Sequence, residues 1–109
     1  MAKVWVTPYR GVDINSNLVV QVLAWPPLSD PIVIDFTSGA AKGGSALPSG
    51  TTYVEIYADA ACHIELQDHA DAASATTANE PFAAGFPVQR RLPVGVPAGG
   101  WGVSAIAMA

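Results

Sequence analysis

The single cysteine of the chain stands next to a histidine, in a segment that also carries three acids. Residues 49–66 read "SGTTYVEIYADAACHIEL" and contain Cys62 and His63, with the carboxylates Glu55, Asp59 and Glu65. A cysteine nucleophile needs a nearby base that holds it as the thiolate. Adjacent residues on a strand point to opposite faces, so Cys62 and His63 cannot form such a dyad with each other. We expect Cys62 to pack in the core, where free cysteines are usually found.

A metal site is the next chemistry that this region suggests. His63 and Glu65 share one face of the expected strand, and a polar loop with Asp68, His69 and Asp71 follows. Structural metal sites use three or four ligands at recognisable spacings, and the cluster matches neither such a pattern nor a calcium loop. We expect a solvated strand face, with no metal and no other cofactor. An enzyme that uses His63 or His69 is the alternative, but nothing in the sequence requires catalysis or a small-molecule substrate.

Composition favours one folded domain that is covered by neighbours. The chain has 109 residues, half of them apolar, and 13% are charged, against about 25% in an ordinary soluble domain. The net charge is −4, and of the five basic residues only Arg90 and Arg91 are adjacent. Nucleic-acid binding requires clustered cations, so we expect none. Sparse surface charge indicates that other subunits cover part of this protein in an assembly.

The N-terminus and the apolar runs bear on localisation. The start, "MAKVWVTPYR", lacks the apolar stretch of a signal peptide, and no apolar run approaches the roughly 18 residues of a membrane span. One cysteine allows no disulfide within the chain. We expect synthesis in a cytoplasm and no membrane association.

Ten glycines and nine prolines divide the chain into short apolar runs that alternate as strands do. We expect about seven short strands and no helix, in an all-β, single-domain antiparallel β-sandwich that could take the form of a jelly roll. Residues 1–17 are expected to form an extended arm, which could add a strand to a neighbouring chain, or the first strand, and residues 18–109 to form the sandwich. Residues 59–61 should be a tight turn that closes a hairpin, with Val54, Ile56, Cys62 and Ile64 buried.

Aromatic residues are the best candidates for contacts with a partner. Trp5, Tyr9 and Arg10 lie in the N-terminal segment, and Tyr53 and Tyr57 share one face of the strand expected at 51–58. Exposed aromatic side chains anchor protein interfaces, and they also stack on sugars or bases. Tyr53 and Tyr57 could equally belong to the core face of a second sheet, and the sequence leaves both interpretations open.

The second half of the chain resembles a known group of proteins. The segments "ALPSGTTYVEIYADAACHIEL" and "FPVQRRLPVGVPAGGWGVSAIAMA" are similar to small virion proteins of tailed bacteriophages. The resemblance spans residues 46–109 and carries no catalytic motif. The pattern has a glycine soon after the positions that match residues 61–64, where this chain has "ELQDH" (residues 65–69). The matching positions are Leu47, Pro48, Gly50, Thr51, Val54, Ile56, Ala58, Asp59, Ala61, Cys62, His63, Ile64, Leu92, Pro93 and residues 103–107.

The resemblance implies a non-enzymatic structural protein of the virion. It points to a decoration, or cement, protein on the outer surface of the capsid, which binds the major capsid protein as a homotrimer and bridges its subunits. The alternative is a tail or fibre component that binds host-surface carbohydrate or neighbouring tail proteins. We expect the contacts with the capsid to involve Trp5, Tyr9, Arg10, Tyr53 and Tyr57. In the tail or fibre alternative, exposed aromatic residues such as Tyr53 and Trp101 would surround a sugar-binding groove.

Overall fold

Alternating burial along the first strand organises the structure. In β1 (Lys3–Tyr9), Val4, Val6 and Pro8 are buried, and the residues between them are only partly covered.

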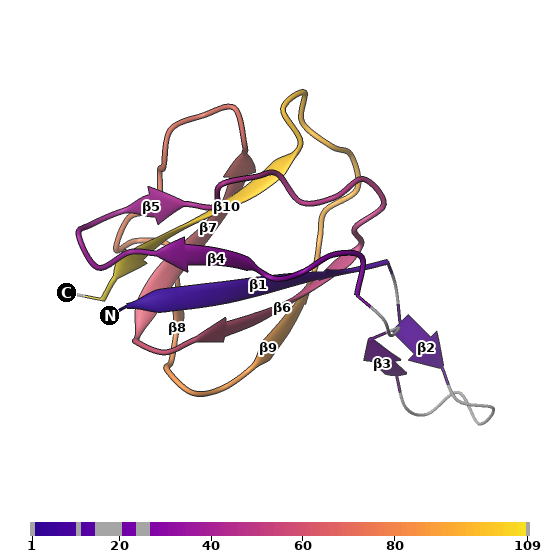
Figure 1. Cartoon of the computed structure of the whole chain (residues 1–109), viewed down its shortest axis with the longest axis horizontal. Coiled ribbons are helices and arrows are strands. Elements are labelled where there is room, and N and C mark those ends of the chain that lie inside the picture. Colours follow the sequence, from indigo (N-terminus) through magenta and orange to yellow (C-terminus); the bar gives the residue numbers. More distant parts are fainter. Residues whose placement is uncertain (1, 11, 15–20, 24–26, 109) are drawn as a thin grey trace.

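The computed structural model describes residues 2–10, 12–14, 21–23 and 27–108, with only the backbone for 12–14 and 21–23. These residues form ten strands and no helix, rather than the seven strands expected. The predicted all-β, single-domain antiparallel sandwich is confirmed (Figure 1).

Two four-stranded antiparallel sheets pack face to face. The first sheet has the order β4-β1-β6-β9, and the second has the order β5-β10-β7-β8. A third, two-stranded pair, β2 with β3, projects beyond the end of β1 in the segment that leads to β4 (Figure 1). The remaining bounds are β2 (Val12–Ile14), β3 (Gln21–Leu23), β4 (Ile32–Asp35), β5 (Ala41–Lys42), β6 (Tyr53–Ala58), β7 (Cys62–Asp68), β8 (Glu80–Phe82), β9 (Val88–Arg91) and β10 (Trp101–Ala107).

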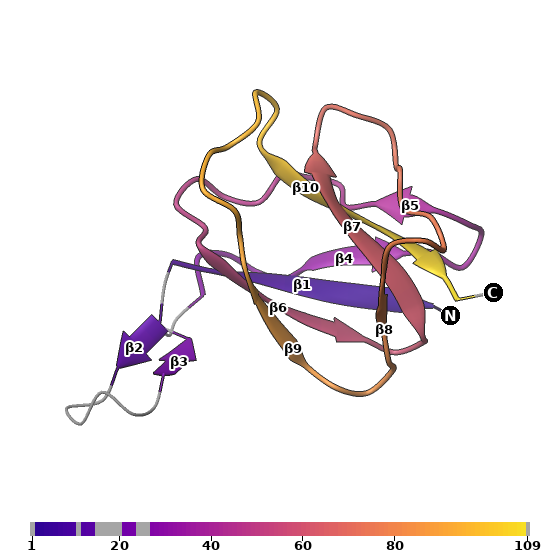
Figure 2. The ribbon, with the colours of Figure 1, turned by 180° about the vertical axis from the view of Figure 1, so that it is seen from behind.

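The strand pairs follow the path of a jelly roll. The arm β4–β5–β6–β7 folds back on the arm β8–β9–β10, which gives the antiparallel pairs β7–β8, β6–β9 and β5–β10. Successive pairs alternate between the two sheets, as in a long hairpin wrapped into a double-sheet roll. The fourth pair is β4–β1, so the N-terminal strand takes the place of a strand that would follow β10. Figure 2 shows the start of β1 and the end of β10 at the same end of the sandwich.

The N-terminal strand lies inside the first sheet. Residues 3–9 pair with β4 on one side and with β6 on the other. Pro8 fits within β1 although it has no amide hydrogen. Its carbonyl oxygen points away from β6 and accepts a hydrogen bond from the Leu28 amide at 2.9 Å. The nitrogen of a strand residue points to the same side as its carbonyl oxygen, so the nitrogen of Pro8 faces no strand that needs a donor. The boundary expected at residue 17 lies outside the described residues.

The predicted hairpin at 53–66 is wrong, although its burial pattern is confirmed. Val54 and Ile56 are buried from β6, and Cys62 and Ile64 are buried from β7. However, β6 pairs with β1 and β9, and β7 pairs with β10 and β8, so the two strands belong to different sheets. Their apolar faces meet across the core instead of lying side by side. Alternation indicates which face of a strand is buried, but it does not identify the strand's partner.

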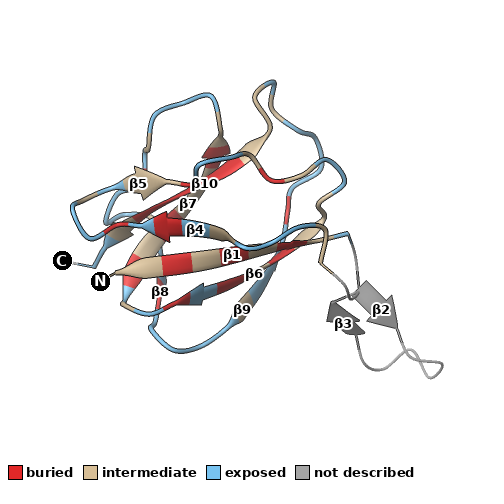
Figure 3. Ribbon diagram, in the orientation of Figure 1, coloured by how far each residue is buried: buried red, intermediate tan, exposed pale blue. Residues whose placement is uncertain are grey.

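The core fills the space between the sheets (Figure 3). Mostly branched side chains of the first sheet pack against side chains of mixed size from the second, and Phe36 and Leu47 extend the cluster beyond the strands. The buried members on the strands of the two sheets are Val4, Val6, Ile34, Val54, Ile56, Ala58, Cys62, Ile64, Phe82, Val103 and Ala105.

The turn between β6 and β7 holds both ends of the described chain. The Lys3 amide donates to Asp59 Oδ1 at 2.7 Å, and the Asp59 amide donates back to the Lys3 carbonyl at 3.0 Å. At the other end, the Met108 amide donates to the Ala61 carbonyl at 3.2 Å. The turn therefore joins the first strand and the last strand at one end of the sandwich.

We expect Asp59→Ala to lower the free energy of unfolding by about 1 kcal/mol, because the Lys3 amide loses a carboxylate acceptor at a partly solvated site. Asp59→Asn keeps an oxygen at the same position and should lose less than Asp59→Ala. Urea unfolding followed by tryptophan fluorescence measures both variants. Equal unfolding midpoints for the wild type and Asp59→Ala would contradict this role of the turn.

Candidate binding surface

The outward side chains of the first sheet gather the aromatic residues on one face. Trp5 of β1 stands between Val33 of β4 and Tyr57 of β6. Toward the other end of β1, Tyr9 stands opposite Tyr53. We call this surface the aromatic face and define it by Trp5, Tyr9, Val33, Tyr53 and Tyr57. Tyr53 and Tyr57 thus lie on the outer face of the sandwich, which answers the question that the sequence left open.

The rings of the aromatic face contact one another and a guanidinium group. The Trp5 and Tyr57 ring centroids are 5.9 Å apart and the rings are tilted by 48°. The Arg91 guanidinium carbon lies 6.0 Å from the centroid of the Tyr53 ring. Tyr57 is 41% exposed and Val33 is 45% exposed, so apolar surface remains open to solvent on both sides of Trp5. Contacts of this kind hold the rings in place and leave their outer surfaces free.

Charges on the aromatic face are balanced in sign. Lys3 pairs across the strands with Asp35, and Glu55 and Arg91 lie on the neighbouring strands. The Asp35 pKa is lowered, first by the hydroxyl hydrogen bond from Thr37 and also by the charge of Lys3. Burial raises the Tyr9 pKa, and the Glu55 carboxylate raises it further, so Tyr9 stays a neutral phenol at physiological pH. The face therefore combines aromatic area with two charges of each sign.

The outer face of the second sheet is covered by the chain itself. The loop at 69–79 crosses it, and the Ala75 amide donates to the buried Ser104 hydroxyl of β10 at 3.0 Å. Gln67 of β7 donates to the Ala72 carbonyl at 2.8 Å and accepts from the Ser74 amide at 3.1 Å. Lys42 of β5 donates to the His69 and Asp71 carbonyls, each at 2.6 Å. Among the described residues, a loop held by such hydrogen bonds covers the outer face of the second sheet and none covers the aromatic face.

Four of the five predicted contact residues meet on the aromatic face. Trp5, Tyr9, Tyr53 and Tyr57 are brought together by the β1–β6 register, and Arg10 is exposed just beyond the end of β1. The sequence did not predict Val33 and Arg91 as contact residues. Their own strand patterns marked them as outward, but only the strand order places them beside the aromatic rings.

Cys62 and His63 lie on opposite sides of β7 and do not meet. Cys62 is fully buried, and burial, with a smaller contribution from the Asp59 charge, raises the pKa of its thiol to about 11. His63 points to the other side of β7, where its Nδ1 lies 2.8 Å from the Asn79 carbonyl. A buried thiol with a raised pKa is a packing group and a poor nucleophile. Within the described part of the chain, no three His, Cys, Asp or Glu residues are placed to hold a metal ion.

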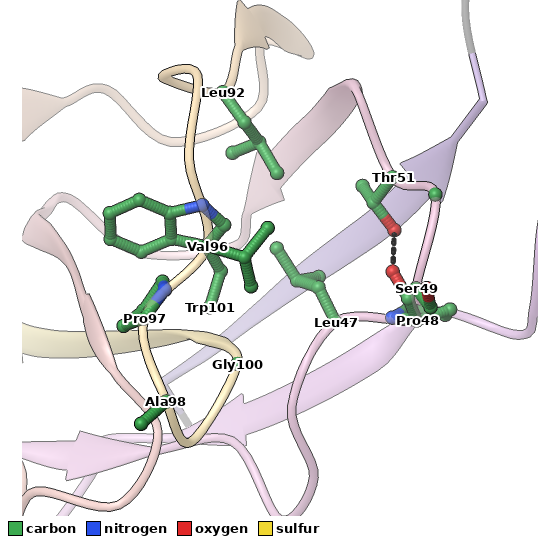
Figure 4. Close-up of a pocket in the computed structure, with 11 residues that line it drawn as sticks. Leu47, Pro48, Ser49, Thr51, Leu92, Val96, Pro97, Ala98, Gly100 and Trp101 are labelled. Carbon is green, nitrogen blue, oxygen red and sulfur yellow. Dashed lines mark hydrogen bonds between the residues drawn. The ribbon is translucent and has the colours of Figure 1, made fainter.

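A hollow of about 350 Å³ opens at the end of the sandwich near the start of β6 (Figure 4). We call it the end pocket. It lies between the loop before β6 and the loop from β9 to β10, and no charged residue lines it. Its lining includes Leu47, Pro48, Ser49, Thr51, Val96 and Trp101.

A smaller hollow of about 220 Å³ lies along the side where β8 and β9 face each other across the sandwich. Arg90 bridges this side, because its guanidinium group bonds to Glu80 and lies 5.5 Å from the centroid of the Phe82 ring. An inward-pointing arginine on an edge strand also disfavours pairing of that edge with another chain.

Comparison with known proteins identifies no relative: no family model, no curated protein and no solved structure matches this chain. No helix that could cross a membrane is found among the described residues.

The raised thiol pKa predicts how stability depends on pH. Because the folded state holds the Cys62 proton more tightly than the unfolded chain, the stabilisation is complete below the unfolded pKa of about 9 and is lost as pH rises toward about 11. The free energy of unfolding should therefore fall more steeply between these values in the wild type than in Cys62→Ala. Urea titrations at several pH values test this, and parallel pH profiles for the two proteins would contradict it.

Proposed function

We propose that this protein is a non-enzymatic structural protein of a tailed-phage virion, which decorates the outer surface of the capsid and docks there through the aromatic face. The observation that carries the proposal is the open, aromatic outer face of the first sheet, opposite a second sheet that its own loop covers. Aromatic anchors with few and balanced charges are typical of the centre of a protein–protein interface. The resemblance of residues 46–109 to small virion proteins supplies the identity of the partner, the major capsid protein.

Such binding would stabilise the shell by mass action. A protein that binds the assembled shell, and not its free subunits, shifts the equilibrium toward the assembled state. As the homotrimer that the resemblance implies, the protein would contact several neighbouring capsid subunits at once and so bridge them. The sandwich, with its first and last strands both held at the 59–61 turn, suits a protein exposed on a particle surface.

A second candidate function is carbohydrate binding by a tail or fibre component. Between the two aromatic pairs of the face lies a row of polar side chains, in which Thr7, Glu55 and Gln89 stand next to one another. Rings flanked by hydrogen-bonding groups can stack on sugars and bind their hydroxyl groups. Jelly rolls also occur in lectins as well as in viral capsid proteins, so the fold accommodates either function.

The test is cosedimentation with expanded capsids that lack this protein. The wild type should bind them, and Tyr57→Ala should bind at least about tenfold more weakly, because an exposed aromatic anchor is lost at the centre of the interface. Phe86→Ala is the matched control: Phe86 is 67% exposed but lies off the aromatic face, and its loss should leave binding unchanged.

Capsids that bind no wild-type protein, or that bind Tyr57→Ala as well as the wild type, would contradict the proposal. A glycan array provides the comparison with the second candidate. Sugar binding that Tyr57→Ala abolishes, together with no capsid binding, would favour the tail or fibre function.

A further inference from the structure

The outer edge of β4 carries backbone groups that face away from the first sheet. The Phe36 amide donates to the Ala2 carbonyl of the neighbouring strand at 2.9 Å. Bonded pairs alternate along an antiparallel ladder, so the backbone groups of Ile34 also face β1, and those of Val33 and Asp35 face away from it. Among the described residues, no group is hydrogen-bonded to the amides and carbonyls of Val33 and Asp35.

The other edge of the first sheet, β9, is protected against pairing with a further strand. The Leu92 amide donates to the Thr52 carbonyl at 2.8 Å, so the odd-numbered residues of β9 face outward. Pro87 and Pro93 stand on this outward line, one before β9 and one after it, and neither has an amide to donate. Arg90 adds an inward charge, which also disfavours pairing of this edge.

The edge strands of the second sheet are shorter than β4. β5 has two residues, and β8 has three, with Pro81 in the middle. β4 has four residues, none of them proline, and its inward side chains, Ile32 and Ile34, carry no charge. Figure 1 shows β4 on the side of β1 opposite β6. Of the four edge strands in the two sheets, β4 is the one that combines this length with no proline and no inward charge.

The free edge of β4 adjoins the aromatic face. Val33 belongs to both, because its side chain stands beside Trp5 and its backbone groups face outward. Free amides and carbonyls that recur at every second residue match the backbone of an extended strand. A helix does not match them, because its own backbone groups are bonded within the helix. The chemistry of the edge therefore specifies what covers it.

We propose that β4 accepts an extended segment of the partner, which adds a strand to the first sheet beside the aromatic face. Val33 and Asp35 offer two donors and two acceptors to that strand. The main-chain bonds supply affinity, and the side chains that come to lie next to Val33 supply specificity. This inference rests on the proposed function for the partner, the major capsid protein, and it names the kind of segment that docks.

Cosedimentation of proline variants with capsids that lack this protein tests the proposal. Val33→Pro removes an outward amide that no described group accepts, so the variant should fold. It should bind capsids at least about tenfold more weakly than Val33→Ala, which loses the same side chain but keeps the amide. Gln89→Pro is the matched control, because it removes an outward amide from β9, and it should bind as the wild type does. Urea unfolding midpoints report whether the proline variants are folded.

Hydrogen exchange of the wild type gives a second measurement that needs no substitution. The Val33 and Asp35 amides should exchange about tenfold or more slowly on the capsid than in the free protein, because they become donors to the added strand. The Gln89 and Arg91 amides of β9 should exchange at the same rate in both states. NMR spectra recorded after quenching and release from the capsid resolve the four amides.

The outcomes separate strand addition from docking itself. Suppose that Tyr57→Ala weakens capsid binding, while Val33→Pro binds as well as Val33→Ala. The aromatic face would then remain the docking surface, and strand addition would be overturned. Unchanged exchange of the Val33 amide on the particle would overturn it as well. A wild type that binds no capsids would overturn both proposals.

Discussion

Burial of one face of β1 and β6 against the second sheet is the constraint on which the rest of the structure depends. Val4 and Val6 on β1, with Val54 and Ile56 on β6, supply much of the core from the first sheet. Because side chains alternate along a strand, burial of these residues forces Trp5, Tyr9, Tyr53 and Tyr57 to the outside. A slip of either strand by one residue would place aromatic rings in the core and expose the valines. The core thus sets the register that assembles the aromatic face.

The outer faces of the two sheets differ in whether a loop of the chain covers them. The second sheet is covered by its own loop, which Gln67, Ser104 and Lys42 hold through hydrogen bonds to the loop backbone. No described loop is held in this way over the first sheet, and its rings and the Lys3 and Asp35 side chains stay at the surface. This asymmetry, rather than any single residue, is the reason why we propose the aromatic face as the docking surface.

The sequence predicted the burial of strands well and their pairing poorly. Alternation at 53–58 and 62–66 placed Val54, Ile56, Cys62 and Ile64 inside and His63 outside, as the structure has them. It could not show that β6 and β7 lie in different sheets, because a hairpin and a crossing between sheets bury the same alternate residues. β5 has two residues and β8 has three, one of them Pro81, which is too few for periodicity to detect. Val33 and Arg91 join the aromatic face only through strand order, and Ser104 is buried by a loop rather than by the core.

The most direct test of the account is hydroxyl-radical footprinting of the protein bound to the capsid and free in solution. The account predicts that oxidation of Trp5 and Tyr57 falls on the particle while oxidation of His63, on the outer side of the second sheet, stays the same. Unchanged oxidation of Trp5 and Tyr57 together with protection of His63 would show that the other face meets the shell, and would contradict the assignment of the aromatic face as the docking surface.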